Sequence, residues 1–546
     1  MQNQARNLSP AVLDQAHVGD IHGAFGTVGQ HDTAQRKSWL ARLRTLLVIM
    51  GPGLIVMVGD NDAGGVATYA QAGQNYGTHL LWVLLLLIPV LIVNQEMVVR
   101  LGLVTGVGHA KLIFERFGRF WGAFSVGDLL FVNFLTLVTE FIGVDLAMSY
   151  FGVSPYVSVP IAAVLLIAST LTGSFRRWET VMYLFIAVNF LAIPLAVMSH
   201  PVTGTVIHNF LVPGVGSHFN SNMMLLIISM VGTTVAPWQL FFQQSNVIDK
   251  RLTPRWMAYE RADTVIGSFV VIIGAAALII ATGFAFHHTH LAGAFVDGGA
   301  VARGLHTTLG SFAGASFAII LLNASLIGAA AVTLSTSYAI GDTFGIKHSL
   351  HRKVSDAPGF YISYALMVLI AGGIVLVPHA PLGVITTAVQ ALAGILLPSA
   401  TVFLLLLCND KEVLGPWVNK LWLNIVSSVI VGVLVMLSFI LAAQTLFPAI
   451  NIGAFMEAML IVFAAGLLVS IIMLVRQHGK IDRTPASAEA DHVLVDPRMW
   501  RMPPLQQLSK PVWSKTRKFG MLTLRAYLFI AVLMMIVKAI QLALGM

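Results

Sequence analysis

Apolar residues recur along this chain in runs about as long as a lipid bilayer is thick. Between residues 45 and 475 these runs alternate with short polar segments, and each can cross a hydrocarbon core of roughly 30 Å as a helix. A further apolar stretch at 521–543 is either an additional span or a helix on the membrane surface. We therefore predict an all-α membrane protein of about 12 transmembrane helices, with spans at 45–73, 80–103, 120–148, 156–172, 179–199, 222–246, 264–286, 311–341, 360–378, 382–407, 420–447 and 454–475.

The polar segments divide the chain into parts around this transmembrane core of residues 45–475. Residues 1–44 form an N-terminal cytoplasmic tail, and the first 38 of them are polar enough to be predicted disordered. Residues 476–520 contain several prolines and many basic residues, and they indicate an irregular cytoplasmic linker. Residues 521–546 contain the C-terminal apolar helix.

Composition and charge agree with a protein that crosses the membrane many times. Of the 546 residues, 57% are hydrophobic and 10% are charged. If the N-terminus is cytoplasmic, 30 of the 32 Lys and Arg residues fall in cytoplasmic segments, and the exceptions are Arg303 and Lys538. The positive-inside rule then predicts a cell (inner or plasma) membrane protein with a cytoplasmic N-terminus. The net charge of +8 comes from basic residues on the cytoplasmic side of the membrane, so it does not indicate nucleic-acid binding.

The first predicted span is interrupted at its centre. Residues 60–62 read Asp-Asn-Asp where the middle of the membrane should lie, and glycines at 59, 64 and 65 flank them. Glycine costs about 1 kcal/mol against alanine within a helix, so the helix is weak at this point. Acidic residues at bilayer depth are expensive, and their presence indicates a functional site for a cation.

A second interruption lies five spans later. In the span 222–246, Pro237 removes a backbone donor and clashes with the preceding turn, so we expect a break between Gly232 and Pro237. Matched breaks in spans one and six are typical of a LeuT-type inverted repeat of five plus five spans. Backbone carbonyls freed at both breaks, together with the carboxylate of Asp62, provide an all-oxygen site suited to a hard cation.

These residues resemble the NRAMP family of divalent-metal transporters, and within it the NRAMP-related magnesium transporters. The resemblance covers roughly residues 45–475 and is carried by Gly51-Pro-Gly53, Ala67-Thr68, Gln74-Asn-Tyr-Gly77 and the segment around Pro237. The family has Asp-Pro-Gly-Asn at the first break. Counted from Gly51, those positions are Asp62, Ala63, Gly64 and Gly65 here, so the resemblance implies that Asp62 is kept as the principal metal ligand.

The resemblance also implies the other members of the site. At the second break, the coordinating carbonyl falls on Thr233, Ala236 replaces the family's methionine ligand, and Trp238 replaces a histidine implicated in proton coupling. Gln390 occupies the position of a metal-proximal glutamine in span ten. We expect the Gly59 carbonyl to contribute as well.

The departures from the family favour magnesium. A thioether ligand selects soft metals, so its absence at Ala236 removes the group that would reject Mg²⁺. Mg²⁺ keeps several waters, and the smaller side chains at Gly65 and Ala236 leave room for them. Loss of the histidine, and of an aspartate now replaced by Leu137, makes proton coupling doubtful.

Three further polar residues in the spans have two readings each. Asp60 either attracts the cation as an outer-shell carboxylate or bonds the unwound backbone. Glu140 is either a remnant of the family's proton and polar network or a buried carboxyl paired with a hydroxyl or amide. Asn61 is expected to cap the backbone rather than bind metal.

Other polar residues are weaker candidates. The loop histidines 287, 288 and 290 either capture metal at the entrance or belong to an ordinary polar loop. Asp128 and Asp145 lie toward the ends of span three. In span eight the polar residues, which line a path or bond neighbouring helices, are Asn323, Thr333, Ser335 and Thr336.

The sequence thus predicts a divalent-cation transporter that imports partly hydrated Mg²⁺, and also Mn²⁺, without proton coupling. Its main rival is a proton-coupled Mn²⁺/Fe²⁺ transporter. An amino-acid carrier of the same fold would place no acids at the first break. An intramembrane enzyme would need a catalytic motif, and none is recognisable, so we predict neither catalytic residues nor a cofactor. A non-transporting sensor and the oligomeric state stay open.

Overall fold

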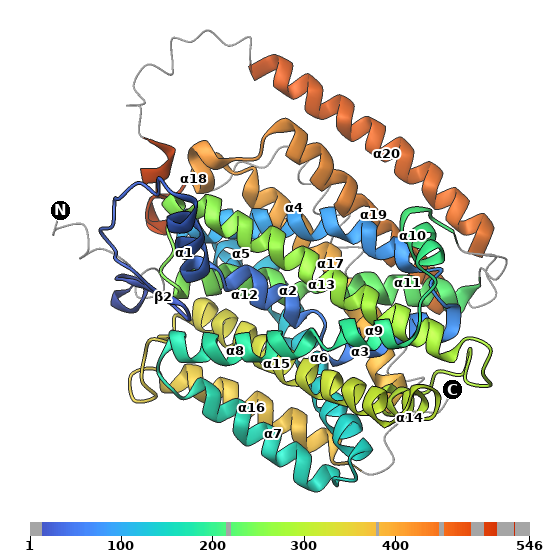
Figure 1. Ribbon diagram of the computed structural model, residues 1–546. Helices are drawn as coiled ribbons and strands as arrows, with labels where there is room; N and C mark the ends of the chain where they lie inside the picture. The colour runs from blue at the N-terminus through green and yellow to red at the C-terminus, as the bar shows by residue number, and fades with distance from the viewer. Residues whose placement is uncertain are drawn as a thin grey trace.

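Two interrupted membrane spans lie at the centre of the structure (Figure 1). This computed structural model describes residues 14–214, 220–377, 382–446, 452–481, 496–509 and 529. The first span comprises α2 (Pro52–Gly59) and α3 (Ala63–Tyr76), and the sixth comprises α11 (Ser221–Thr234) and α12 (Pro237–Asp249). Every residue of α2 and of α12 is buried, so the interrupted spans form the core of the bundle. Both predicted breaks are present.

The first span also bends before it enters the bundle. Helix α1 (Trp39–Ile49) meets α2 at an angle of 55°, and Gly51 between them has φ 150°, a conformation that a side chain would strain. Asp263 stabilises the start of α2. Its carboxylate accepts hydrogen bonds from the backbone N–H groups of Gly51, Gly53 and Leu54 at 2.7–3.0 Å. Helix α2 therefore takes its N-terminal cap from another span.

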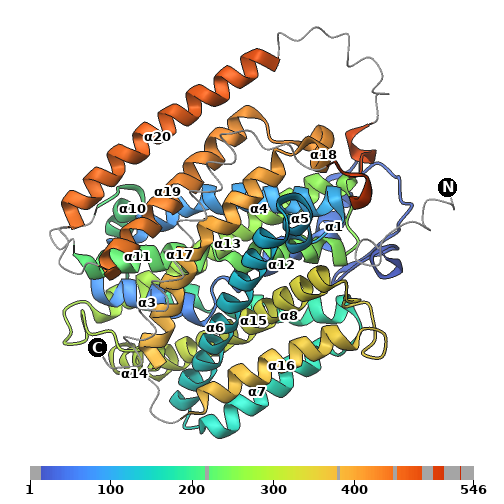
Figure 2. The same ribbon diagram turned by 180° about the vertical axis from the view of Figure 1, so that it is seen from behind.

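The remaining spans surround this core (Figure 2). Helices α7 and α16 lie side by side at one edge of the bundle, and α20 lies at another. The bounds are α4 (Leu81–Thr105), α6 (Arg119–Tyr150), α7 (Pro155–Thr170), α8 (Phe175–Asn189) with α9 (Ala192–Met198), α13 (Met257–Phe286), α15 (Ser311–Phe344), α16 (Pro358–Val375), α17 (Leu382–Cys408), α19 (Leu421–Leu446) and α20 (Ile452–Ile481).

The predicted number of spans is not confirmed. Over the described residues, nine helices are long and apolar enough to cross a membrane, or ten if the bent pair α1–α2 is one span. Helix α7 has 16 residues, and the apolar part of α20 covers Gly453–Val469. Both fall short of the roughly 20 residues that a perpendicular span needs.

Short helices connect the spans at the two ends of the bundle. Near the N-terminus lie α5 (His109–Phe117) and α18 (Lys411–Leu414), whereas α10 (Thr203–Leu211) and α14 (Gly298–Leu309) lie at the opposite end (Figure 1). The described 3₁₀ turns are η2 (Gln15–His17), η4 (Pro254–Trp256), η5 (Gly415–Trp417), η7 (Pro497–Met499) and η8 (Leu505–Gln507).

The N-terminal segment corrects the prediction of disorder. From residue 14 onward it is folded, and β1 (Ile21–Gly23) pairs antiparallel with β2 (Gly26–Val28). Ile21 and Val28 are 2% and 6% exposed and belong to the hydrophobic core. The segment is polar in composition, but two apolar side chains on one face of a hairpin suffice to fix it when a helix lies against that face.

The C-terminal part is only partly described. Helix α20 continues to Ile481, beyond the predicted end of its span. Residues 496–509 are irregular, as predicted for the linker, and they bind the same end of the bundle as the N-terminal segment. The Trp417 Nε1 donates to Pro497 O at 2.8 Å, and the Met502 N–H donates to Val104 O at 3.3 Å. The predicted helix at 521–543 lies outside the described residues apart from residue 529.

Candidate metal site

The two helix breaks lie directly against each other. A Cβ atom built on Gly65, in the first turn of α3, would be 2.6 Å from the Asp60 carbonyl oxygen and 3.1 Å from the Thr233 Oγ1. Glycine at this position therefore allows the break of the first span to approach the end of α11. The Thr233 hydroxyl is buried and has no hydrogen-bond partner there. Asp62 and Thr233, predicted to share one site, are brought together.

Asp62 occupies the start of α3. It is 2% exposed, and its Oδ1 accepts a hydrogen bond of 2.6 Å from the Gly65 N–H, which makes it the N-cap of the helix. The positive end of the α3 dipole favours negative charge at this position. The carboxylate is thus held at the break by local backbone geometry.

Glu140 brings a second carboxylate to the same helix end. Its Oε2 accepts from the Ala63 N–H at 3.1 Å, and its Oε1 is buried without a partner. A Cβ built on Gly328 of α15 would be 2.8 Å from both the Asp62 Cβ and the Glu140 Oε2. Only a glycine in α15 leaves space for the two acids side by side. Among the described contacts, Glu140 is bonded to the Ala63 N–H of the first break and not to a hydroxyl or amide side chain.

Asp60 is held by an amide that the sequence reading did not consider. Gln239 Nε2 donates to Asp60 Oδ1 and also to the Thr234 carbonyl at 3.1 Å. Gln95 Nε2 donates to Gln239 Oε1 at 2.8 Å, which fixes the orientation of the Gln239 amide. Asp60 Oδ2 remains buried and without a partner. The signal in the sequence was a glutamine one residue after Trp238, in a buried helix that carries several other polar residues.

Asn61 points away from these acids. Its Nδ2 donates to the Val271 carbonyl at 3.1 Å. The same nitrogen lies against Gly274, where an added Cβ would be only 2.6 Å from it. This contact ties the break to the middle of α13, so the side chain links two spans instead of capping a helix end as expected.

Gln390 of α17 closes the site from another side. A Cβ built on Gly64 would lie 1.6 Å from Gln390 Nε2, so the amide rests on the bare backbone of the break. The same Nε2 atom is buried and has no hydrogen-bond partner. Gln390 therefore lies against the first break, and its role near a metal stays a prediction.

Ala236 lies in the second break, and Trp238 lies in the first turn of α12. Ala236 has extended backbone angles, with φ −81° and ψ 149°, and precedes the first residue of α12. Trp238 is fully buried against Gly59, where a Cβ would be 3.1 Å from its Cη2. Its carbonyl accepts from the Ser335 hydroxyl at 3.0 Å. The indole thus fills space beside Gly59 rather than binding a polar partner, and its Nε1 is unpaired.

A second missed contact spans the breaks. The hydroxyls of Tyr69 and Thr234 lie 2.7 Å apart, and both side chains are buried. This bond joins α3 to the end of α11, in the same way that Gln239 joins Asp60 to α12.

The weaker candidates lie elsewhere. Asp128 accepts from Ser399 at 3.0 Å, and Asp145 accepts from Ser149 at 3.1 Å. Asn323 bonds the Phe185 carbonyl, so it links two helices. The loop rings of residues 287 and 288 lie 3.7 Å apart.

The described part of the chain has no cluster of charged or thiol side chains that could bind a metal by itself. No three His, Cys, Asp or Glu residues are grouped there so as to hold a metal ion. A cation at the breaks would have to combine one or two carboxylates with carbonyl, amide or water oxygens. This is the ligand set that Mg²⁺ commonly takes in proteins.

A small cavity lies beside the first break. Its wall includes Ala63 at the start of α3, together with Phe295 and Asp297. Thr139 and Thr386 also line it. It has room for about one water molecule next to the residue whose backbone Glu140 caps.

Comparison with known proteins identifies the family. A family profile described as natural resistance-associated macrophage protein-like (Nramp) matches residues 53–444. The "Divalent metal cation transporter MntH" of Staphylococcus aureus is 24% identical over 428 residues, which cover 73% of this chain and 91% of that protein. Several strains of this bacterium have similar matches.

Solved structures agree on the fold. A crystal structure of the Eremococcus coleocola manganese transporter, bound to an aromatic bis-isothiourea compound, has a TM-score of 0.64 at 21% identity and covers 82% of this chain and 98% of that one. A mutant of the same transporter has a TM-score of 0.65 at 19% identity, with 85% and 99% covered. At these identities the likeness shows the fold, and it confirms the predicted inverted-repeat class. The sequence match over most of the chain shows that this protein belongs to the NRAMP family.

Proposed function

We propose that this protein is a divalent metal transporter that imports partly hydrated Mg²⁺, and also Mn²⁺, without coupling to protons. The observation that supports the proposal is the pair of carboxylates, Asp62 and Glu140, at the start of α3, with a third acid, Asp60, held by Gln239 at the end of α2. The buried oxygens Asp60 Oδ2 and Glu140 Oε1 have no partner. Acidic groups at bilayer depth require a compensating charge, and a dication provides it.

The choice of a hard cation rests on the donor types at the breaks. Oxygen donors at the breaks are the Asp62 carboxylate and the Thr233 carbonyl, the Gln390 amide lies against Gly64, and the sulfur-free residue Ala236 stands at the second break. Oxygen ligands suit Mg²⁺ and Mn²⁺, whereas softer metals gain most from sulfur. Mg²⁺ is usually held through one or two carboxylates and keeps several waters, which fits a site with few charged ligands.

Proton coupling is not needed to drive uptake. A membrane potential of 100 mV contributes about 2.3 kcal/mol per elementary charge, which is about 4.6 kcal/mol for a dication. We place the protein in a cell membrane with its N-terminus on the cytoplasmic side. Arg251, Arg352 and most other basic residues belong to the end of the bundle that carries the N-terminus.

A proton-coupled Mn²⁺ transporter is the alternative. It is favoured by the names of the similar proteins, a divalent metal cation transporter and a manganese transporter. Glu140 is a carboxyl beside the break that such a transporter could use.

The deciding experiment is uptake into proteoliposomes under a fixed membrane potential, with Mg²⁺, Mn²⁺ and Ca²⁺ in competition and internal pH recorded at the same time. We expect Mg²⁺ and Mn²⁺ to enter and compete with each other while internal pH stays constant. Acidification that follows metal entry, together with exclusion of Mg²⁺, establishes the alternative instead.

A further inference from the structure

The N-terminal segment is bound across several transmembrane elements at one end of the bundle. We name residues 14–28, which contain η2, β1 and β2, the N-terminal latch. Arg251, just after α12, donates from Nε to the Ala16 carbonyl at 2.8 Å and from its NH1 to the Asp20 carbonyl at 3.3 Å. Arg251 adopts φ 65°, which turns the chain sharply at the end of the sixth span. The latch is thereby fixed to the sixth span.

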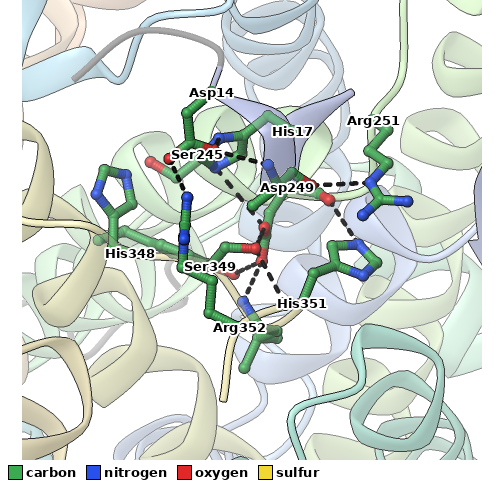
Figure 3. Close-up of polar contacts among 12 residues, drawn as sticks. Asp14, His17, Ser245, Asp249, Arg251, His348, Ser349, His351 and Arg352 are labelled. Carbon is green, nitrogen blue, oxygen red and sulfur yellow. Dashed lines mark hydrogen bonds and ion pairs between the residues drawn. The ribbon is translucent and has the colours of Figure 1, made fainter. Parts of the chain in front are cut away.

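A second anchor lies in the loop that follows α15. Arg352 forms an ion pair with Asp14, and Asp14 also accepts from His17 Nδ1 at 3.0 Å (Figure 3). Burial raises the pKa of Asp14, but the contacts with His17 and Arg352 outweigh it and hold the pKa below its usual range. The charged form therefore prevails at neutral pH, and the ion pair persists.

A third anchor reaches the fifth span and the hinge of the first. The Ala24 N–H donates to Glu179 Oε2 at 2.5 Å, and Glu179 Oε1 pairs with Lys250 at 2.5 Å. Lys250 also donates to the Met50 carbonyl at 2.8 Å, between α1 and α2. Both charged side chains are fully buried, so removing one partner would leave an uncompensated charge.

The latch covers a pocket between the sixth and eighth spans. Its wall includes His17 from the latch, Ser245 from α12, and Asp342 and His348 from α15 and the following loop. Figure 3 shows His17 directed toward Asp249, and its Nε2 lies 3.8 Å from Asp249 Oδ1.

In folds of this kind, alternating access requires the broken spans to move against the rest of the bundle around a fixed site. The latch joins the end of the sixth span, the hinge of the first, the fifth span and the loop after the eighth. These elements cannot separate while all three anchors hold. We propose that the N-terminal latch keeps the cytoplasmic exit closed and must release before the ion leaves. The proposal rests on the transport function and orientation proposed above.

A glycine in the latch permits a selective test. A Cβ on Gly23 would lie 2.0 Å from the Val48 carbonyl of α1, so Gly23→Val forces the hairpin off the bundle. Gly29→Val is the matched control, because the nearest atom to its Cβ would be 3.9 Å away. The readout is the rate at which a thiol reagent, applied from the cytoplasmic side, labels Ser245→Cys in a Cys408→Ala background. Cys408 is the chain's one cysteine.

We expect Gly23→Val to increase the labelling rate at least threefold, and Gly29→Val to leave it unchanged. Equal rates in the two variants overturn the proposal. Arg352→Gln, which removes one anchor without steric strain, provides an independent test if Gly23→Val does not fold, and it is expected to raise labelling in the same direction. Because labelling needs no transported ion, its outcome is separate from that of the Mg²⁺ uptake experiment.

Discussion

The Glu140 carboxylate and the Ala63 backbone N–H lie 3.1 Å apart and join α6 to the first turn of α3. The bond is buried, and it sets an acid from the third span beside Asp62. Glu140→Ala should leave that N–H without an acceptor and cost about 1–3 kcal/mol of stability. Glu140→Gln keeps an acceptor oxygen and should cost less. Thermal unfolding in detergent compares them, and equal losses would show that the bond is not what holds Glu140.

Asp62→Asn should reduce Mg²⁺ uptake at least roughly tenfold, which corresponds to about 1.4 kcal/mol. The amide preserves the size of the side chain but removes the charge that balances a dication. Asp128→Asn is a suitable control, since Asp128 is a half-buried acid of α6 that bonds Ser399 rather than a residue of the breaks. Equal uptake by the Asp62 variant and wild type would remove Asp62 from the site.

Gly64→Ala should displace Gln390. The added Cβ would lie 1.6 Å from Gln390 Nε2, whereas the matched substitution Gly127→Ala, in α6, meets nothing within 4 Å. If Gln390 positions the ion or its water, uptake should fall roughly 10- to 100-fold. The double variant Gly64→Ala with Gln390→Ala should regain folding, measured by size-exclusion chromatography, without regaining transport. Recovery of transport would indicate that Gln390 only fills space.

Ala236→Met should shift selectivity toward softer metals. The thioether would stand at the break between α11 and α12, where it can bind Mn²⁺ or Cd²⁺ better than Mg²⁺. Competition assays in proteoliposomes should show the Mn²⁺ to Mg²⁺ preference rising about tenfold or more, equivalent to about 1.4 kcal/mol. A Mg²⁺ preference unchanged by the substitution would place Ala236 outside the ion's reach.

The ion pair between His348, in the loop after α15, and Asp342 should stabilise the protein less at alkaline pH. Burial lowers the pKa of His348, but the Asp342 carboxylate, 3.2 Å from its Nε2, outweighs this and raises the pKa to about 9. A raised pKa contributes stability that is complete below about 6.5, the pKa of an unfolded histidine, and is lost as pH rises through 9. The melting temperature should therefore fall more between pH 7 and pH 10 in wild type than in His348→Gln. Parallel falls would contradict the ion pair.

Much of the site's composition was predictable because it depends on local sequence. The acids at 60–62, the glycines beside them and Pro237 determine where the helices break, and Thr233 and Gln390 follow from the resemblance to a known family. The partners of these residues were not predictable. Gln239 reaches Asp60 only because Gln95, on another helix, fixes the direction of its amide.

The N-terminal segment was predicted wrongly for a related reason. Its composition is polar, and Ile21 and Val28 become a hydrophobic face only when the hairpin closes and α1 lies against it. The acceptor of the Ala24 N–H is 155 positions away along the chain. Such contacts are properties of the assembled bundle, and no pattern within the segment indicates them.

The cap that Asp263 provides for α2 has a mechanical consequence. The N–H groups of Gly53 and Leu54 in α2, and that of Gly51 just before it, are satisfied by a side chain of α13, and exposing them inside the membrane would cost several kcal/mol. We therefore expect α2 and α13 to move as one body during transport, so that the bend at Gly51 turns two spans rather than one.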